Sequence, residues 1–288
     1  GALGGSATYI ALAAKYFTSR VGLVAVVGGD LPDEYRCVFD DASLNTDGVQ
    51  VIPDGKTFAW GGRYHYDLNE RETLFTDLNV LSAFRPDVPR PFRSKGIVCL
   101  GNLSPEVQLE VLNQVAEPDL VLCDTMNYWI ENSAPTLRRL LRRVDVLIVN
   151  DAEARELAGV ANLVKAARII RALGPRILII KKGEHGALLF YEEQIFSAPA
   201  YPLEDIQDPT GAGDAFMGGL AGYLAHNRTI DEDTLRRGVI VGSAMASFAV
   251  EQFGPSRLLG VAPEEIWKRV EAFRILAHIP SYKLDIVQ

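Results

Sequence analysis

Short apolar runs of strand length recur along the chain and are separated by stretches with helical periodicity. The apolar runs are continuous rather than alternating, which is typical of strands covered on both faces. The sequence predicts strands at 21–27, 96–100, 120–123, 144–149 and 177–180. Helical patterns lie between and after them, at about 104–117, 132–143, 151–158 and 161–173. This alternation predicts an α/β fold of three layers, α/β/α, with a mainly parallel central sheet and right-handed connections.

Three segments depart from this alternation. Closely spaced short strands between residues 186 and 201 predict an antiparallel hairpin at the sheet edge, and helices are predicted at 212–227, 232–250 and 263–277. Within 48–80, three strands with polar–apolar alternation predict a small projecting sheet. We interpret 48–80 as a β lid inserted in a single domain that covers 1–288, with a surface hairpin without function as the alternative. Lid residues that could cover a ligand are Arg63, Tyr64 and Tyr66.

Composition excludes several classes of protein. The net charge of −8 argues against a nucleic-acid partner, since phosphate binding needs a basic surface. Apolar runs are too short for a membrane span, and the first residues carry no basic region or cleavage site typical of a secretion signal. The three cysteines form no C-x-x-C pair, so neither a disulfide framework nor a thiolate metal site is indicated. We therefore expect a cytoplasmic protein.

The chemistry is concentrated in residues 208–214, which read Asp-Pro-Thr-Gly-Ala-Gly-Asp and precede a predicted helix rich in small residues. The small side chains of Gly211, Ala212 and Gly213 let their backbone amides approach a ligand closely. A helix N-terminus offers unpaired N–H groups and a positive dipole end, which together suit a phosphate. Asp214 lies in the first turn, where a carboxylate can accept a hydroxyl proton. A plain turn and helix cap are the alternative.

The stretch DPTGAGDAFMGG resembles the C-terminal signature of the ribokinase family, the PfkB carbohydrate kinases. Three further elements resemble that family and occur in its order over nearly the whole chain. They are the Gly-Gly element at Gly4 and Gly5, the N-x-x-E element at Asn150 and Glu153, and the loop Lys181-Lys182-Gly183-Glu184-His185-Gly186. The resemblance implies an ATP-dependent phosphotransferase that moves the γ-phosphate of ATP to a hydroxyl of a small sugar or nucleoside.

The resemblance also implies roles for individual residues. Asp214 would be the general base, and the amides of Gly211, Ala212 and Gly213 would form the anion hole. Asn150 and Glu153 would organise the phosphates, with Glu153 holding Mg²⁺ indirectly. The nucleotide would contact Lys181, Lys182, Gly183, Glu184, Gly186 and Ser243; the two lysines could equally be solvated. A K⁺ site is left open at Asp208, Thr210, Ala249, Gln252 and Gly254, and a homodimer through the lid is left open as well.

Substrate-side residues are expected at Gly4, Gly5 and Tyr9, and at Asn102, Asp124 and Asn127, which follow predicted strands. Helix capping is the alternative for the last three. Tyr9 stands where the family has an asparagine, and it could stack on a substrate ring or simply pack. The family also begins with a strand that carries a substrate-binding aspartate, and this chain starts after it; we expect the natural protein to be longer. A catalytically silent nucleotide-binding regulator is the competing function, although the intact GAGD argues against it.

Overall fold

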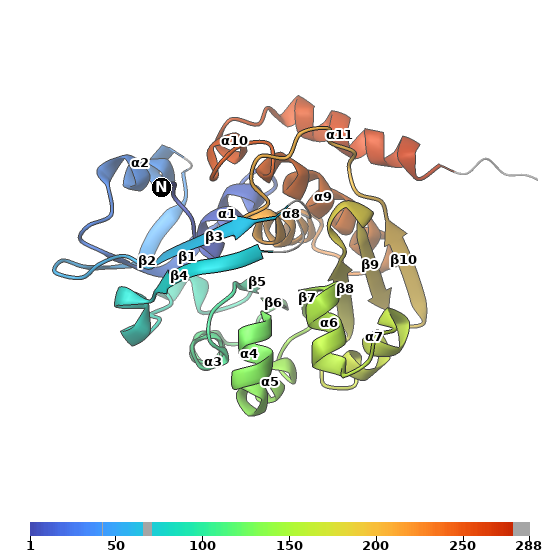
Figure 1. Ribbon diagram of the computed structural model, residues 1–288, viewed down its shortest axis with the longest axis horizontal. Helices are drawn as coiled ribbons and strands as arrows, with labels where there is room; N and C mark the ends of the chain where they lie inside the picture. Colours follow the sequence, from blue (N-terminus) through green and yellow to red (C-terminus); the bar gives the residue numbers. More distant parts are fainter. Residues whose placement is uncertain (42, 66–70, 279–288) are drawn as a thin grey trace, which may run out of the picture.

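A six-stranded sheet occupies the centre of the computed structural model, which describes residues 1–41, 43–65 and 71–278 (Figure 1). Its strand order is β10-β9-β8-β7-β6-β5. The strands are β5 (Ile97–Leu100), β6 (Leu120–Asp124), β7 (Val146–Asn150), β8 (Ile177–Lys181), β9 (Ala187–Tyr191) and β10 (Gln194–Ala198). Strands β5 to β8 are parallel, whereas β9 and β10 form an antiparallel hairpin at one edge. The predicted mainly parallel sheet and edge hairpin are confirmed.

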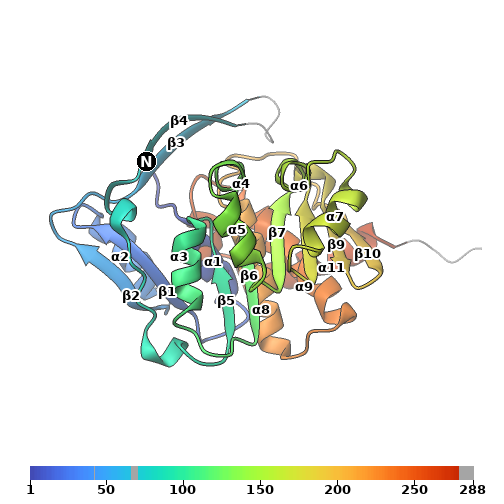
Figure 2. The same ribbon diagram turned by 90° about the horizontal axis from the view of Figure 1, so that it is seen from below.

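Successive side chains of the central strands enter two different cores, because a strand exposes its side chains alternately on opposite faces. Leu120 and Leu122 of β6 pack toward helices α8 (Ala212–Asn227) and α9 (Glu232–Ala249). Val121 and Cys123 pack toward the opposite layer, which contains α3 (Pro105–Leu112), α5 (Ala134–Leu141), α6 (Asp151–Ala158) and α7 (Leu163–Arg171). The sheet therefore lies between two helical layers, as predicted (Figures 1 and 2).

Helix α1 (Ser6–Ala14) packs directly on α8, and the small residues of α8 allow this close contact. A Cβ on Gly218 would lie 2.2 Å from the carbonyl oxygen of Ile10, so only glycine fits there. Helices α10 (Ser256–Leu259) and α11 (Pro263–Leu276) pack on α9 and complete this layer. The small-residue helix predicted at 212–227 is thus confirmed. Within the described residues, no helix combines the length and apolar character needed to cross a bilayer.

Strand β1 (Gly22–Gly28), helix α2 (Asp33–Asp41) and strand β2 (Asn45–Ile52) form a separate parallel β-α-β unit. The sequence predicted that the first strand of 48–80 joins a small three-stranded sheet, and this is wrong: it belongs to β2 and pairs with β1. Among the described residues of this segment, β3 (Ala59–Tyr64) and β4 (Arg71–Asp77) form the projecting antiparallel hairpin. An alternating pattern marks a strand but not its partner, which explains the error. Figure 2 shows this hairpin arching over the body.

A groove separates the β1–β2 unit from β5, the last strand of the central sheet. Among the described residues β1 pairs only with β2 and β5 only with β6, so their facing edges carry no strand partner. Leu23 and Val26 of β1 and Ile97 and Cys99 of β5 line a continuous cavity of about 2370 Å³. Ligand pockets are typically roughly 300–1,000 Å³, so this cavity extends beyond a substrate site.

Candidate active site

The loop before α8 is fixed by a buried aspartate. Asp208 is 8% exposed, and its carboxylate accepts backbone N–H bonds from Thr210 (2.9 Å) and Gly254 (3.4 Å). The backbone N–H of Gln207 also donates to the carbonyl of Val250 just beyond α9, at 2.9 Å. The loop is therefore anchored to the end of α9, so the start of α8 is held in place without a ligand.

Gly211 is the N-cap of α8 and has a left-handed backbone, with φ at 80°. The ring of Tyr9 lies directly against it, since a Cβ at Gly211 would be 2.4 to 2.5 Å from ring carbons of Tyr9. Tyr9 is 2% exposed, and burial together with Asp208 and Asp214 raises the pKa of its hydroxyl. These contacts favour packing over stacking as the role of Tyr9. Tyr9 forms the wall behind the helix N-terminus.

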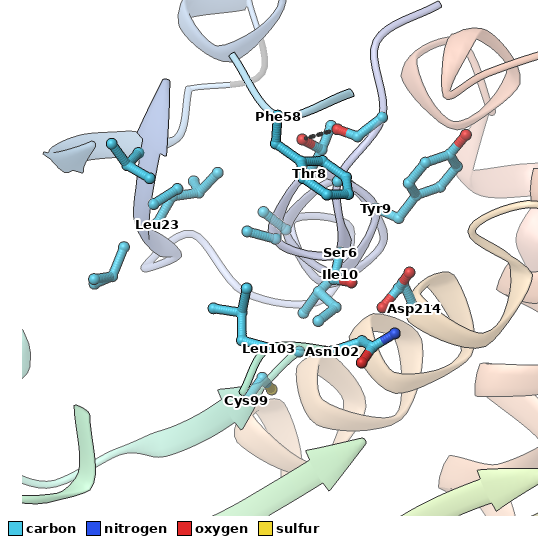
Figure 3. A pocket seen from close by; sticks show the side chains of 18 of the residues that line it. Ser6, Thr8, Tyr9, Ile10, Leu23, Phe58, Cys99, Asn102, Leu103 and Asp214 are labelled. Carbon is cyan, nitrogen blue, oxygen red and sulfur yellow. Dashed lines mark hydrogen bonds between the residues drawn. The ribbon is translucent and has the colours of Figure 1, made fainter. Parts of the chain in front are cut away.

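Asp214 lies in the first turn of α8 and, with Gly211, lines the cavity. Figure 3 shows the carboxylate of Asp214 pointing toward the space near Asn102 and Ile10. The predicted base and one residue of the predicted anion hole, Gly211, are therefore at the cavity, whereas Ala212 and Gly213 are not among its lining residues. Their catalytic roles stay predictions.

Asn150 and Glu153 form a capping box at the start of α6. The backbone N–H of Asn150 donates to Oε2 of Glu153, and the backbone N–H of Glu153 donates to Oδ1 of Asn150, both at 2.8 Å. Asn150 ends β7, the strand between β6 and β8, so the pair lies at the carboxyl edge of the sheet. The N-x-x-E spacing thus has a structural role, and it fixes the orientation of the Glu153 carboxylate.

The strands on either side of β7 end in a pair of opposite charges. Nζ of Lys181, at the end of β8, lies 3.7 Å from Oδ2 of Asp124, at the end of β6. Gly213 has no side chain, and the Nζ atom of Lys181 lies 2.5 Å from the point where a Cβ on this residue would be. Burial lowers the pKa of Lys181, but Asp124, Glu153 and Asp214 raise it by more, so the net pKa is raised. Lys181 therefore forms an ion pair with Asp124, and the charges of Glu153 and Asp214 also favour its charged form.

The remaining residues of the predicted nucleotide loop lie beyond β8. The backbone N–H of Lys182 donates to the carbonyl of Gly186 at 2.7 Å, which closes the loop around the short helix η3 (Gly183–His185). Gly183 and Glu184 are exposed, so they can contact a ligand. Ser243 is half-buried within α9.

On the substrate side, Asn102 is held by two side chains that the sequence did not single out. Its Oδ1 accepts a hydrogen bond from Nε1 of Trp129 at 3.0 Å, and its Nδ2 donates to Sδ of Met126 at 3.2 Å. Asn102, Trp129 and Phe58 all line the cavity, and Figure 3 shows Asn102 and Phe58 on opposite sides of it. Asn127 begins α4 (Asn127–Asn132) and is exposed. The sequence does contain a signal that could have identified Trp129 as a site residue: in the run DTMNYW, an aromatic residue closely follows the carboxyl end of a predicted strand.

At the N-terminus of α1, Gly5 is the helix N-cap and the carbonyl of Gly4 accepts a hydrogen bond from Oγ1 of Thr8 at 2.9 Å. Both glycines line the cavity. The lid also reaches the site: the hydroxyls of Tyr64 in β3 and Thr210 lie 3.2 Å apart. Tyr66 lies outside the described residues. Of the predicted substrate, base and lid residues, the following line one cavity: Gly4, Gly5, Tyr9, Asn102, Asn127, Asp214 and Tyr64. Asp124 and Arg63 are not among its lining residues, and Arg63 is exposed beside Glu72 of the lid.

The candidate metal residues lie in two places: Glu153 is at the start of α6, and the others are in and around the loop before α8. Asp208, Thr210 and Gly254 are joined by hydrogen bonds, with Ala249 at the end of α9 and Gln252 just beyond it. In the described part of the chain, no group of three or more histidine, cysteine, aspartate or glutamate side chains could hold a metal ion alone. The donors therefore fit Mg²⁺ only as a metal that arrives with phosphate oxygens and waters, which is its usual mode in phosphoryl transfer.

A three-layer α/β/α fold, a glycine-lined helix N-terminus with an aspartate in its first turn, and a lysine beside it define a phosphoryl-transfer enzyme of the ribokinase-like class. The chain belongs to the pfkB family of carbohydrate kinases, whose sequence model matches residues 2–259. It is a sugar or nucleoside kinase, a phosphotransferase with an alcohol group as acceptor.

Individual relatives agree with this class. The chain is 32% identical over 234 residues to a cytidine kinase of Thermococcus kodakarensis, which covers 80% of this chain and 82% of the relative. The structure of Burkholderia thailandensis nucleoside kinase in complex with inosine superposes with a TM-score of 0.74 at 24% identity, covering 93% and 87% of the two chains. Aminoimidazole riboside kinase from Salmonella enterica gives a TM-score of 0.73 at 21% identity, covering 93% and 92%. At these identities the structures support the fold.

Proposed function

We propose that the protein is an ATP-dependent nucleoside kinase that moves the γ-phosphate of ATP to a hydroxyl of a nucleoside. One observation carries this proposal: Asp214 and Gly211 line the acceptor cavity, while the Lys181 ammonium lies at Gly213, one residue away. The nucleotide and acceptor elements thus meet at the first turn of α8. If the GAGD turn had been directed away from the sheet edge that carries Asn150 and Lys181, the proposal would have failed.

Asp214 accepts the proton of the attacking hydroxyl in this mechanism. The backbone amides of residues 211–213 and the positive end of α8 stabilise charge on the phosphoryl group while it is transferred. Phosphoryl transfer needs positioning and charge neutralisation more than covalent chemistry, and the anchored loop at Asp208 supplies that positioning. The Tyr64–Thr210 contact brings the lid onto the same loop, where closure excludes water.

Two ions belong to the proposal. Glu153 would help hold Mg²⁺ through the nucleotide phosphates, and that ion would neutralise phosphate charge. A K⁺ ion is proposed for the loop of Asp208, Thr210, Ala249, Gln252 and Gly254, where most ligands would be backbone carbonyls. A homodimer through the lid stays a prediction; exposed apolar side chains on β4, Leu74 and Phe75, are compatible with it.

A nucleoside is favoured over a free sugar by the aromatic lining of the acceptor cavity. Phe58 and Trp129 both line it, and the indole of Trp129 is oriented by its hydrogen bond to Asn102. Flat aromatic surfaces suit a nucleobase, whereas a sugar needs mainly hydroxyl partners. The similarity to a cytidine kinase over four fifths of the chain supports the same choice.

The test is coupled ADP release with ATP and Mg²⁺ over a panel of nucleosides, pentoses and hexoses, with and without K⁺. We expect a nucleoside to give the highest kcat/KM. Asp214→Asn should lower kcat by roughly 10²- to 10⁴-fold, the usual contribution of a general base, with nucleotide affinity largely retained. Asp205→Asn, at an exposed carboxylate on the preceding loop, is the matched control and should behave as wild type.

Each outcome of this panel is informative. A pentose or hexose as the best acceptor would replace the nucleoside assignment but keep the kinase. Near-normal turnover by Asp214→Asn would remove the base assignment. Nucleotide binding without stimulation by any acceptor would favour the catalytically silent regulator.

A further inference from the structure

The side chain of Lys181 occupies an unusual place for a cation. Its ammonium group lies beside Gly213, in the first turn of α8, where the helix presents the positive end of its dipole. A lysine is normally favourable at the other end of a helix, near the C-terminal carbonyls. The side chain is 20% exposed, so solvent does not fully screen this repulsion. The Lys181 ammonium group and the positive end of the α8 dipole therefore lie at the same place.

Carboxylates hold the ammonium group in this place. Asp124 is the nearest partner, at 3.7 Å, and its own orientation is fixed because Oδ1 accepts the backbone N–H of Thr125 at 2.8 Å. The backbone carbonyl of Asp124 also accepts from Nε2 of Gln108 at 3.1 Å. Asp124 is 8% exposed, so this support is rigid and largely desolvated. The arrangement keeps a positive charge beside the anion hole even when no anion is bound.

We propose that Lys181 binds the phosphoryl group during its transfer, and that Asp124 is a positioning residue that holds the Lys181 ammonium at the anion hole. This inference rests on the proposed kinase function. It gives Asp124 a role different from the substrate contact predicted from the sequence, and it separates two adjacent lysines that the sequence left equivalent.

Lys182 provides the contrast. Consecutive residues of an extended segment direct their side chains to opposite faces, so Lys181 and Lys182 cannot share one environment. The backbone of Lys182 closes the loop through Gly186, which is a contact that any residue can make. Lys182 is therefore a matched control: the same residue type, next in sequence and on the same loop, but without the ion pair to Asp124.

The first experiment compares Lys181→Met with Lys182→Met in steady-state kinetics, and measures ADP and AMP-PNP affinity by calorimetry without acceptor. Because a charged hydrogen bond is lost, Lys181→Met should lower kcat/KM for ATP by roughly 10- to 100-fold. It should weaken AMP-PNP binding more than ADP binding, since the group lies where the terminal phosphate is expected. Acceptor KM should change by less than about 3-fold, and Lys181→Arg should restore part of the loss. Lys182→Met is the comparison at the same loop: it should lower kcat/KM for ATP by much less than Lys181→Met and should weaken ADP and AMP-PNP binding equally.

Folding is checked by circular dichroism and Tm, with Lys181→Gln as the second variant if a methionine beside Asp124 prevents folding. Equal losses in Lys181→Met and Lys182→Met, or unchanged AMP-PNP affinity and kcat in a folded Lys181 variant, would overturn the proposal. The kinase function itself would be unaffected, because it is tested by wild-type turnover and by Asp214→Asn. Absence of wild-type turnover would instead remove the proposed function.

The second experiment tests the positioning role of Asp124 with a double-mutant cycle of Asp124→Asn and Lys181→Met. If Asp124 acts through Lys181, adding Asp124→Asn to Lys181→Met should cost less than about 2-fold in kcat/KM for ATP, although each single change is harmful. Multiplicative losses, or a rise confined to the acceptor KM in Asp124→Asn, would show that Asp124 acts on the acceptor or only on the fold, and would refute its assignment.

Discussion

Replacing Gly211 by alanine is expected to destabilise the protein because two independent costs fall on one methyl group. The backbone at Gly211 has φ at 80°, a region that costs an L-residue about 1–2 kcal/mol. The new Cβ would also lie 2.4 Å from a carbon of the Tyr9 ring, and Tyr9 is 2% exposed and has little room to move. Overpacking of this kind costs about 1–3 kcal/mol. The sum is about 2–5 kcal/mol, which corresponds to a fall in Tm of roughly 5–15 °C.

Gly213, two residues further on, is the matched comparison for Gly211. A Cβ on Gly213 would meet only the flexible end of Lys181, and the backbone there is helical. Gly213→Ala should therefore keep Tm within about 2 °C while it impairs turnover, since alanine is favourable within a helix but displaces the ammonium group. Gly260→Ala, where no atom lies within 4 Å of the new Cβ, is the neutral control. Thermal unfolding followed by circular dichroism measures all three, and a Gly211→Ala protein as stable as wild type would refute the Tyr9–Gly211 packing.

Two further predictions concern the lid and the C-terminal helices. Tyr64→Phe removes the hydroxyl that contacts Thr210, so the acceptor KM should rise by about 5-fold, the equivalent of one hydrogen bond, while Tm stays unchanged. Tyr191→Phe, at the far sheet edge, is the control. Equal acceptor KM values in the two variants would contradict the lid contact. The Arg257 side chain, which bonds Glu265 at 2.5 Å, lowers the pKa of that carboxyl. Its contribution to stability is thus present above the ordinary glutamate pKa and lost as pH falls through the lowered folded value. The Tm difference between wild type and Glu265→Gln should accordingly shrink between pH 5 and acid pH, and a difference independent of pH would contradict it.

The central sheet could be predicted because both its faces are covered, which produces continuous apolar runs at 120–123, 144–149 and 177–180. Burial of this kind is a local signal, since each strand carries it alone. The partner of a strand is not a local property. The run at 45–52 alternates whether it pairs with the lid or with β1, and only the fold decides that it pairs with β1. The same limit explains why Trp129 was missed: its value depends on Asn102, which is 27 residues away.

The contacts that each site residue makes in the folded chain could not be predicted from the sequence either. Tyr9 could be placed in the substrate element by resemblance, but its choice between stacking and packing depended on Gly211, about two hundred residues later. Nothing in the sequence distinguished Lys181 from Lys182. In the structure, Lys181 at the end of β8 forms the ion pair with Asp124. Sequence spacing fixes which residues share an element, whereas charge and packing partners come from different elements. Roles that depend on such partners therefore need the folded chain.

The contacts within the N-x-x-E element bear on its proposed role with phosphate. Asn150 and Glu153 form a capping box, which any helix can use, and by itself this would make a role with Mg²⁺ and phosphate unnecessary. The cap nevertheless uses Oε2 of Glu153 to fix the orientation of the carboxylate, whose negative charge raises the pKa of Lys181. A carboxylate that is already ordered loses little side-chain entropy when a metal-bound phosphate arrives, so the capping bonds favour the proposed role instead of competing with it. The helix start that stabilises α6 is also what holds an acidic group at the edge of the sheet where phosphates are proposed to bind.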